Sequence, residues 1–154
     1  MEQILVRLGA EKDATALRDV RRSATETLSR LYRPRPGVIL EEPNPLNAIV
    51  VAEVSGQLVA QCEYSIYNER LNFASLGVLE SHRNRGVFRA VFVFLETIAR
   101  QKNCKSIHCA TIDITGNTRI FERLGMKMES HHESPFFMSP NGDSVIEIRL
   151  SKRL

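Results

Sequence analysis

The sequence predicts a single α/β domain with a mixed, mostly antiparallel sheet and helices on both of its faces. Two patterns lead to this prediction. Residues 73–102 contain an apolar strand pattern, a short arginine-bearing loop and a long amphipathic helix pattern. Short strand patterns joined by turn residues flank this unit on both sides. A chain of 154 residues is long enough for one hydrophobic core, so residues 1–154 are expected to form one domain.

The N-terminal segment should supply one strand and one helix. Residues 4–8 are apolar enough for a strand, and Asp13 is expected to cap a helix that begins near Ala14 and runs to about Tyr32. One face of this helix is apolar: Leu17, Val20, Ala24, Leu28 and Leu31. The other face is basic: Arg18, Arg21, Arg22 and Arg30. This basic face is either a solvated surface or a binding face for acids or phosphates.

The middle of the chain predicts a meander of strands. Prolines and a glycine in residues 33–46 indicate a loop, with room for one short helical turn. Residues 48–54 and 58–65 are expected to form a hairpin that turns at Ser55-Gly56. Residues 71–79 should add a third antiparallel strand. Their part from 73 to 79 is apolar on both faces apart from Ser75, which is typical of a central strand.

The strand–helix–strand unit should place two strands in parallel. Residues 106–110 form the next strand pattern after the helix, and a right-handed crossover would set them beside residues 73–79. Two such strands that diverge open a crevice at their C-terminal ends. The C-terminal part predicts a helix over residues 113–124, ended by Gly125, and strands over residues 128–132 and 145–150.

Composition limits the partners and the compartment. The net charge of +3 is too small to indicate nucleic acid but suits a polyanionic cofactor. No apolar run of membrane-spanning length and no export signal are seen, so a cytoplasmic protein without a membrane partner is expected. The three cysteines lack C-x-x-C spacing and are expected to be reduced thiols. No metal site is expected, because the adjacent His131 and His132 would point to opposite faces of a strand.

The loop at residues 80–85 predicts a phosphate-binding site. It carries Arg83 and Arg85, and Gly86 stands where the long helix should begin. Free N–H groups and the helix dipole at such a position attract anions. From this pattern alone, an ordinary strand–helix junction with solvated arginines remains an alternative.

Two motifs resemble the GCN5-related N-acetyltransferases, the GNAT superfamily. Arg83-Asn84-Arg85-Gly86-Val87-Phe88 resembles the R/Q-x-x-G-x-G/A signature, whose backbone amides bind the pyrophosphate of acetyl-CoA in that family. Phe88 departs from the pattern, and its ring would have to turn into the core. Phe121-Glu122-Arg123-Leu124-Gly125-Met126 resembles the aromatic-x-x-L-G-F signature. The asparagine that the family places seven residues earlier falls at Ile114, so this element is missing.

The resemblance implies acetyl-CoA as the cofactor and a set of binding residues. The backbone of a central strand would hold the pantetheine arm, with Val78 N–H on the thioester carbonyl, and the loop would hold the pyrophosphate. The implied cofactor-binding residues are Leu76, Val78, Leu79, Arg83, Asn84, Arg85, Gly86, Val87, Phe88 and Arg89. The segment of residues 33–46 would be either a wall of the acceptor site or a plain connector.

The catalytic acid and base are open at the sequence level. The tyrosine that donates a proton in the family corresponds to Phe121, which we expect to be a core or pocket-wall residue. The glutamate that some members carry corresponds to Asn72, which does not titrate usefully. The candidates chosen as substitutes are Glu63, Tyr64 and His82, and further titratable groups near the crevice are Glu53, Tyr67 and His108.

The favoured hypothesis is an acetyl-CoA-dependent N-acetyltransferase that moves an acetyl group to a primary amine through a ternary complex. The acceptor would be a small-molecule or peptide amine, and a homodimer is left open. The alternative is a non-catalytic member of the same fold that binds acyl-CoA or a partner. A nucleic-acid-binding module would rest only on the arginines of the first helix.

Overall fold

The computed structural model describes residues 3–39 and 48–154. These residues form an eight-stranded sheet in the order β1-β3-β4-β5-β6-β8-β7-β2. The strands are β1 (Ile4–Leu8), β2 (Arg33–Pro34), β3 (Ala48–Val54), β4 (Gln57–Tyr67), β5 (Arg70–Val78), β6 (Ser106–Ile112), β7 (Lys127–Met138) and β8 (Ser144–Arg153). Neighbouring strands pair antiparallel except β5 and β6, which are parallel. The predicted mixed sheet is confirmed.

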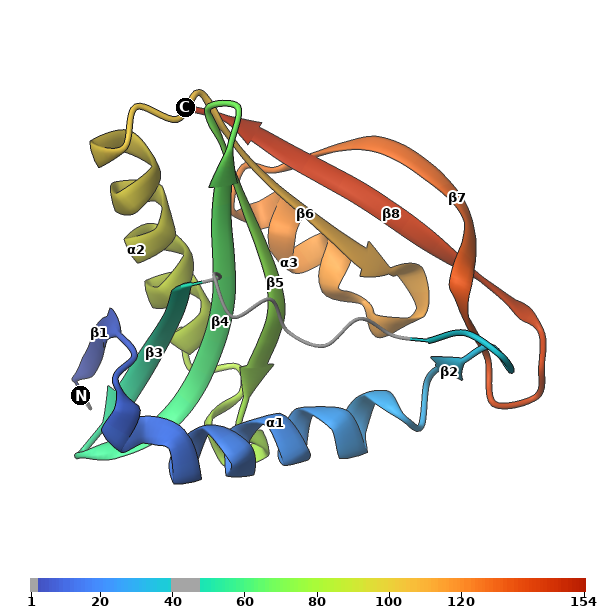
Figure 1. Ribbon diagram of the computed structural model, residues 1–154, viewed down its shortest axis with the longest axis horizontal. Coiled ribbons are helices and arrows are strands. Elements are labelled where there is room, and N and C mark those ends of the chain that lie inside the picture. The colour runs from blue at the N-terminus through green and yellow to red at the C-terminus, as the bar shows by residue number, and fades with distance from the viewer. Residues whose placement is uncertain (1–2, 40–47) are drawn as a thin grey trace.

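Helices cover both faces of this sheet (Figure 1). The helix α1 (Ala14–Leu28) packs on β4 and β5 and buries Leu17 and Val20 against them and β3. The helix α2 (Val87–Gln101) and the short α3 (Asn117–Arg123) contribute to the larger core on the opposite face. None of the helices in the described residues is long and apolar enough to span a membrane.

The parallel pair β5–β6 is short. Pairing runs only from Arg70↔Ser106 to Asn72↔His108, and beyond it the two strands diverge, as predicted (Figure 1). A bulge in β5 follows, because its register against β4 shifts by one residue between Gln61 and Glu63. Ser75 has a φ of 55° at this bulge, and the buried Gln61 side chain donates a hydrogen bond from Nε2 to its carbonyl. A bulge bends the strand and re-aims the following residues.

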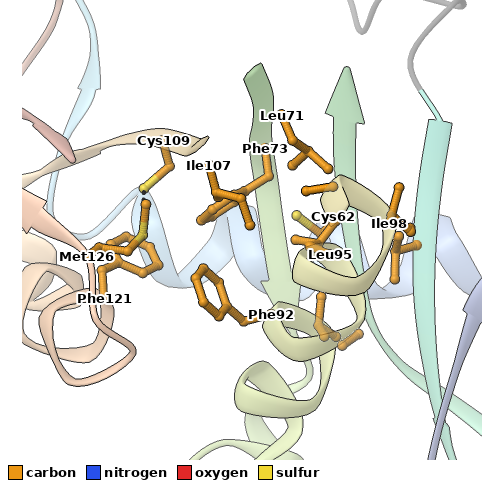
Figure 2. Close-up of a cluster of buried hydrophobic side chains, with 14 of the residues drawn as sticks. Cys62, Leu71, Phe73, Phe92, Leu95, Ile98, Ile107, Cys109, Phe121 and Met126 are labelled. Atoms are coloured by element: carbon orange, nitrogen blue, oxygen red, sulfur yellow. Dashed lines mark hydrogen bonds between the residues drawn. The ribbon is translucent and has the colours of Figure 1, made fainter. Parts of the chain in front are cut away.

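Aromatic rings fill the core beneath the divergence (Figure 2). Phe73 of β5 contacts the rings of Phe92 and Phe121 edge-on, with centroids 6.0 and 5.9 Å apart. Phe88 joins them, 5.4 Å from Phe121, so its ring faces the core as the sequence analysis required. Phe121 is 4% exposed and is therefore a core residue, as predicted.

Several element boundaries differ from the prediction. The first helix ends at Leu28 rather than near Tyr32. Residues 33–34, expected in a loop, pair with β7 as strand β2. Residues 40–46 of that expected loop lie outside the described residues. The helix predicted over residues 113–124 is split into the 3₁₀ turn η3 (Asp113–Thr115), Gly116 at φ 76° and α3. Ile120 of α3 is 41% exposed, whereas Phe121 beside it is buried.

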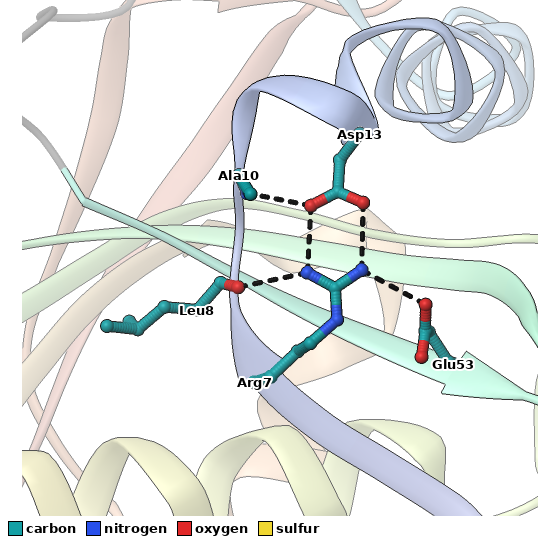
Figure 3. A network of polar contacts seen from close by, with 5 residues as sticks. All are labelled: Arg7, Leu8, Ala10, Asp13 and Glu53. Atoms are coloured by element: carbon teal, nitrogen blue, oxygen red, sulfur yellow. Dashed lines mark hydrogen bonds and ion pairs between the residues drawn. The ribbon is translucent and has the colours of Figure 1, made fainter.

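Asp13 does not cap α1 with its side chain. Its carboxylate instead accepts two hydrogen bonds from Arg7, at 2.9 and 2.8 Å, and one from the Ala10 N–H at 2.7 Å (Figure 3). Arg7 also donates to Glu53 of β3 at 3.0 Å. The Arg7 guanidinium and the Ala10 N–H lower the pKa of Asp13 to about 2. This network joins β1, the start of α1 and β3.

We expect Asp13→Asn to lower the free energy of unfolding at pH 7 by about 1–2 kcal/mol. The pKa of Asp13 in the folded protein lies below the ordinary aspartate value of 3.8, so this contribution is present above pH 3.8 and disappears as the pH falls toward 2. Urea unfolding of both proteins from pH 7 down to pH 3 measures it, and their difference should narrow with falling pH.

Asp19→Asn is the matched control, because Asp19 is an exposed aspartate of α1 with only a 3.9 Å contact to Arg22. It should change stability by less than about 0.5 kcal/mol. An Asp13→Asn variant as stable as the Asp19→Asn variant at pH 7 would contradict a structural role for the network.

Candidate functional site

The larger of two cavities in the described residues, of about 610 Å³, lies between α1, the end of β5, the start of α2 and α3. We call it the cofactor cleft. Its lining comes from α1 (Ala24, Thr27, Leu28), Leu31, β5 (Leu76, Gly77, Val78), the loop and α2 start (His82, Arg83, Asn84, Gly86, Val87, Phe88, Arg89), and Thr115, Asn117, Ile120, Phe121, Arg123 and Leu124. The predicted loop and strand residues therefore come together at one cleft.

The start of α2 is shaped to receive an anion. Asn84 and Gly86 have φ values of 61° and 80°, in the left-handed region that asparagine and glycine adopt most readily. The first backbone bond of α2 runs from Ala90 N–H to Gly86 O at 3.1 Å. The N–H groups of residues 87–89 precede it and, as in any α-helix, have no partner one turn earlier. They suit a phosphate at the helix N-terminus.

Arg83 fixes this loop to its surroundings. Its Nε donates to the Val78 carbonyl at 3.0 Å, and Nη1 donates to the Thr27 hydroxyl of α1 at 3.0 Å. The side chain therefore joins the end of β5 to α1 across the cleft and places its positive charge there. Arg89 lines the same cleft. The two cations complement a polyanion such as the pyrophosphate of coenzyme A.

Most of the implied cofactor residues line the cleft. Leu76, Val78, Arg83, Asn84, Gly86, Val87, Phe88 and Arg89 do so. Leu79 and Arg85 do not belong to the described lining. Both backbone groups of Leu79 are already bonded, its N–H to Val59 O at 2.8 Å and its carbonyl to His82 N–H at 2.9 Å.

A second cavity, of about 260 Å³, opens where β5 and β6 diverge, and we call it the acceptor cavity. Its lining is Leu28, Tyr32, Phe73–Leu76 of β5, Cys109–Ile112 of β6, Thr115, Asn117, Phe121, Phe136, Phe137 and Glu147. Five residues line both cavities: Leu28, Leu76, Thr115, Asn117 and Phe121. The two cavities therefore meet at this boundary.

An irregularity in β7 forms the aromatic wall of the acceptor cavity. The register of β7 against β8 shifts between Glu133 and Met138. There the buried Ser134 hydroxyl accepts hydrogen bonds from the N–H groups of Phe136 and Phe137 at 3.3 and 3.1 Å.

The segment around β2 contacts this wall from the other side. Arg35 donates a hydrogen bond from Nε to the Ser134 carbonyl at 3.1 Å. The ring of Phe137 packs edge-on against that of Tyr32, with centroids 4.9 Å apart. The wall is thus held by β2, the chain after it and β7.

Glu147 and Tyr32 bring a carboxylate and a phenol to the lining of this cavity. Glu147 of β8 has a largely buried side chain, with His132 Nε2 at 3.4 Å and Arg149 Nε at 3.7 Å from its carboxylate oxygens. Burial raises the pKa of the Tyr32 hydroxyl, which therefore stays protonated at neutral pH. Neither residue was singled out from the sequence as a site residue.

The three catalytic candidates named from the sequence do not gather at one place. His82 lines the cofactor cleft, with its Nδ1 2.7 Å from Ser81 Oγ. Glu63 is buried on the α1 side of β4, 3.8 Å from Arg21, and Tyr64 packs against the core. Neither is among the described residues that line the two cavities. We therefore assign no role in transfer to Glu63 or Tyr64.

The sequence patterns did not predict most of the residues that line the acceptor cavity. Phe136 and Phe137 lie outside the strand expected at residues 128–132, and Glu147 lies within the strand expected at residues 145–150, with no pattern that marks it as a site residue. Asn117 lies four residues before Phe121, not seven, but the Gly116 break brings it to the boundary of both cavities. A signal did exist for the wall, because two adjacent phenylalanines in an otherwise polar strand suggest a local irregularity.

Comparisons with known proteins agree with this arrangement. Residues 15–126 match the acetyltransferase (GNAT) family. An uncharacterised N-acetyltransferase of Chlorobaculum tepidum is 25% identical over 121 residues, which cover 73% of this chain and 76% of the relative.

Solved structures share the fold at low identity. The ribosomal-protein-S18-alanine N-acetyltransferase of Escherichia coli aligns with a TM-score of 0.77 at 10% identity, covering 98% of this chain and 94% of that one. A putative streptothricin acetyltransferase of Bacillus anthracis, in complex with acetyl coenzyme A, aligns with a TM-score of 0.71 at 12% identity, covering 99% and 100%. The family match covers most of the chain and includes the loop at Arg83–Phe88, so this protein belongs to the acetyltransferase (GNAT) family.

Proposed function

We propose that the protein transfers an acetyl group from acetyl-CoA to a primary amine within a ternary complex. The observation that carries this proposal is the shared boundary of the two cavities at Leu28, Leu76, Thr115, Asn117 and Phe121. Two substrates bound on either side of that boundary would meet without leaving the protein. Holding both reactants together removes much of the entropic barrier to their reaction.

The cofactor cleft fits coenzyme A at its phosphate end. The N–H groups at the start of α2, together with Arg83 and Arg89, would hold the pyrophosphate. Gly86 leaves open space where a side chain would otherwise stand. Leu76 and Val78 lie along the floor and would position the pantetheine arm. Acetyl-CoA would supply the acetyl group as a thioester, and its presence in the Bacillus anthracis relative supports the same cofactor here.

The boundary residues are mostly apolar, so they would exclude water from the reacting atoms. Phe121 has no proton to give, and Thr115 and Asn117 are the polar side chains that the described boundary contains. The Thr115 hydroxyl already donates to Ile112 O at 2.7 Å and accepts the Asn117 N–H at 3.2 Å. Proton transfer would then pass through the acceptor cavity, where Tyr32 and Glu147 lie, or through water.

Calorimetric titration with acetyl-CoA, followed by thiol release against a panel of amines, tests the proposal. We expect acetyl-CoA to bind and at least one amine to release the thiol. Binding with no release from any amine would favour the alternative, a non-catalytic acyl-CoA-binding protein. The features that favour that alternative are Phe121 and Asn72 in place of titratable groups, and Phe88 in place of a small residue.

Gly86→Glu should weaken coenzyme A binding roughly tenfold or more, because a carboxylate would stand at the phosphate-binding helix start. Gly56→Glu is the matched control. Both glycines have φ near 80° and open space around them, so both variants carry similar backbone strain. Calorimetry with coenzyme A compares them. Equal affinities in the two variants would place the phosphates elsewhere.

Phe121→Leu should retain kcat within about tenfold of the parent, because no proton is lost with the ring. The stability cost should be about 1–2 kcal/mol, from the cavity left beside Phe73 and Phe88. Phe92→Leu is the control for packing, since Phe92 is fully buried in the same cluster and outside both described linings. A thousandfold loss of kcat in Phe121→Leu alone, with normal coenzyme A binding, would assign the ring a catalytic role.

A further inference from the structure

We propose that the acceptor cavity selects a small primary amine with an apolar, preferably aromatic, body and that Glu147 binds its ammonium group. This inference rests on the proposed function, because it names the acceptor class for the same site. It goes beyond the family match, which leaves the acceptor open. Size, charge and the aromatic wall each carry one part of it.

Size limits the acceptor to a small molecule. The cavity volume of about 260 Å³ is close to the lower end of the range of roughly 300–1,000 Å³ that ligand pockets span. A small molecule would therefore fill it. The apolar side chains of Leu28, Leu76 and Ile112 lie among the aromatic rings in its lining. Such a site favours an apolar body over a hydrated chain.

Charge favours a cation. Glu147 is the one charged side chain in the described lining, and it is 15% exposed. The basic side chains that contact it, His132 and Arg149, are 42% and 60% exposed, so water screens the Arg149 charge more than it screens the carboxylate. The electrostatic potential inside the cavity should therefore be negative near Glu147 and attract an ammonium group. A ligand carboxylate would be repelled, which disfavours free amino acids.

The aromatic wall adds a second attraction for the same ligand. Tyr32, Phe136 and Phe137 face the cavity from two different parts of the chain. Aromatic faces attract cations and pack edge-on against other rings. The Phe136 side chain is half exposed to water in the free protein. An apolar ligand that covers this ring would remove apolar surface from water, which favours binding.

The wall is fixed before a ligand arrives. Ser134 is 1% exposed, and its hydroxyl holds the backbone of Phe136 and Phe137, while Arg35 binds its carbonyl. The Arg35 N–H also donates to Phe136 O at 2.8 Å. A ligand therefore does not have to order these rings, and less of its binding energy is lost.

The test is calorimetry with 2-phenylethylamine in the presence of saturating coenzyme A, which lacks the acetyl group and prevents turnover. We expect binding, with 2-phenylethanol, its neutral analogue, at least roughly tenfold weaker. Glu147→Gln should weaken 2-phenylethylamine binding roughly tenfold or more and leave 2-phenylethanol almost unchanged. Glu129→Gln, a carboxylate of β7 outside both described linings, is the matched control and should change neither.

A second variant tests the aromatic part. Phe136→Ala removes a half-exposed ring and should leave the fold intact. It should reduce the preference for 2-phenylethylamine over n-butylamine severalfold, because both amines carry the same charge. An unchanged preference would overturn the aromatic part of the inference.

Other outcomes separate this inference from the proposed function. If coenzyme A binds and Glu147→Gln retains full affinity for 2-phenylethylamine, the assignment of Glu147 is overturned. If spermidine or a peptide with an N-terminal alanine binds more tightly than 2-phenylethylamine, the proposal of a small amine with an apolar body is overturned. If 2-phenylethylamine binds through Glu147 but no amine releases thiol from acetyl-CoA, the ligand preference stands and the transfer reaction fails.

Discussion

The early separation of β5 and β6 is the constraint on which the rest of this structure depends. The strands pair over three residues, and the bulge at Ser75, held by the Gln61 side chain, then turns β5 away. Such a gap inside a sheet exposes polar backbone and apolar side chains unless something fills it. Phe73 and Phe121 fill it on the α2 side. What stays open toward α1 is the acceptor cavity, so packing and site share one origin.

The two cavities differ in how they bind. At the cofactor cleft, backbone N–H groups and the Arg83 and Arg89 side chains suit a phosphate by charge and geometry. The N–H groups are present whatever side chains the helix start carries. This explains how Phe88 is tolerated there, since its ring lies with Phe92 and Phe121 while its N–H remains at the helix start. At the acceptor cavity, the described lining contains one carboxylate, that of Glu147, among mostly apolar and aromatic residues. If this cavity binds the acceptor as we propose, these side chains set its specificity.

The sequence predicted those features that are local. The hairpin at Ser55-Gly56, the crossover from β5 through α2 to β6 and the glycine at the start of α2 follow from periodicity and turn chemistry within a few residues. The errors arose where distant segments compete with local preference. Residues 33–34 pair with β7 and so form a strand instead of a loop. The Asp13 carboxylate accepts hydrogen bonds from Arg7 of β1 instead of capping α1.

By itself, then, the sequence determined the fold class, the position of the loop that we propose binds phosphate, and the family resemblance, because each is encoded in contiguous residues. It could not determine the acceptor side, because Tyr32, Phe137 and Glu147 come from segments far apart in the chain. Only the tertiary structure brings them together, through the β7 irregularity fixed by Ser134 and the divergence of β5 from β6. A binding cavity of this kind depends on relative positions of distant backbones, and no local pattern records those positions.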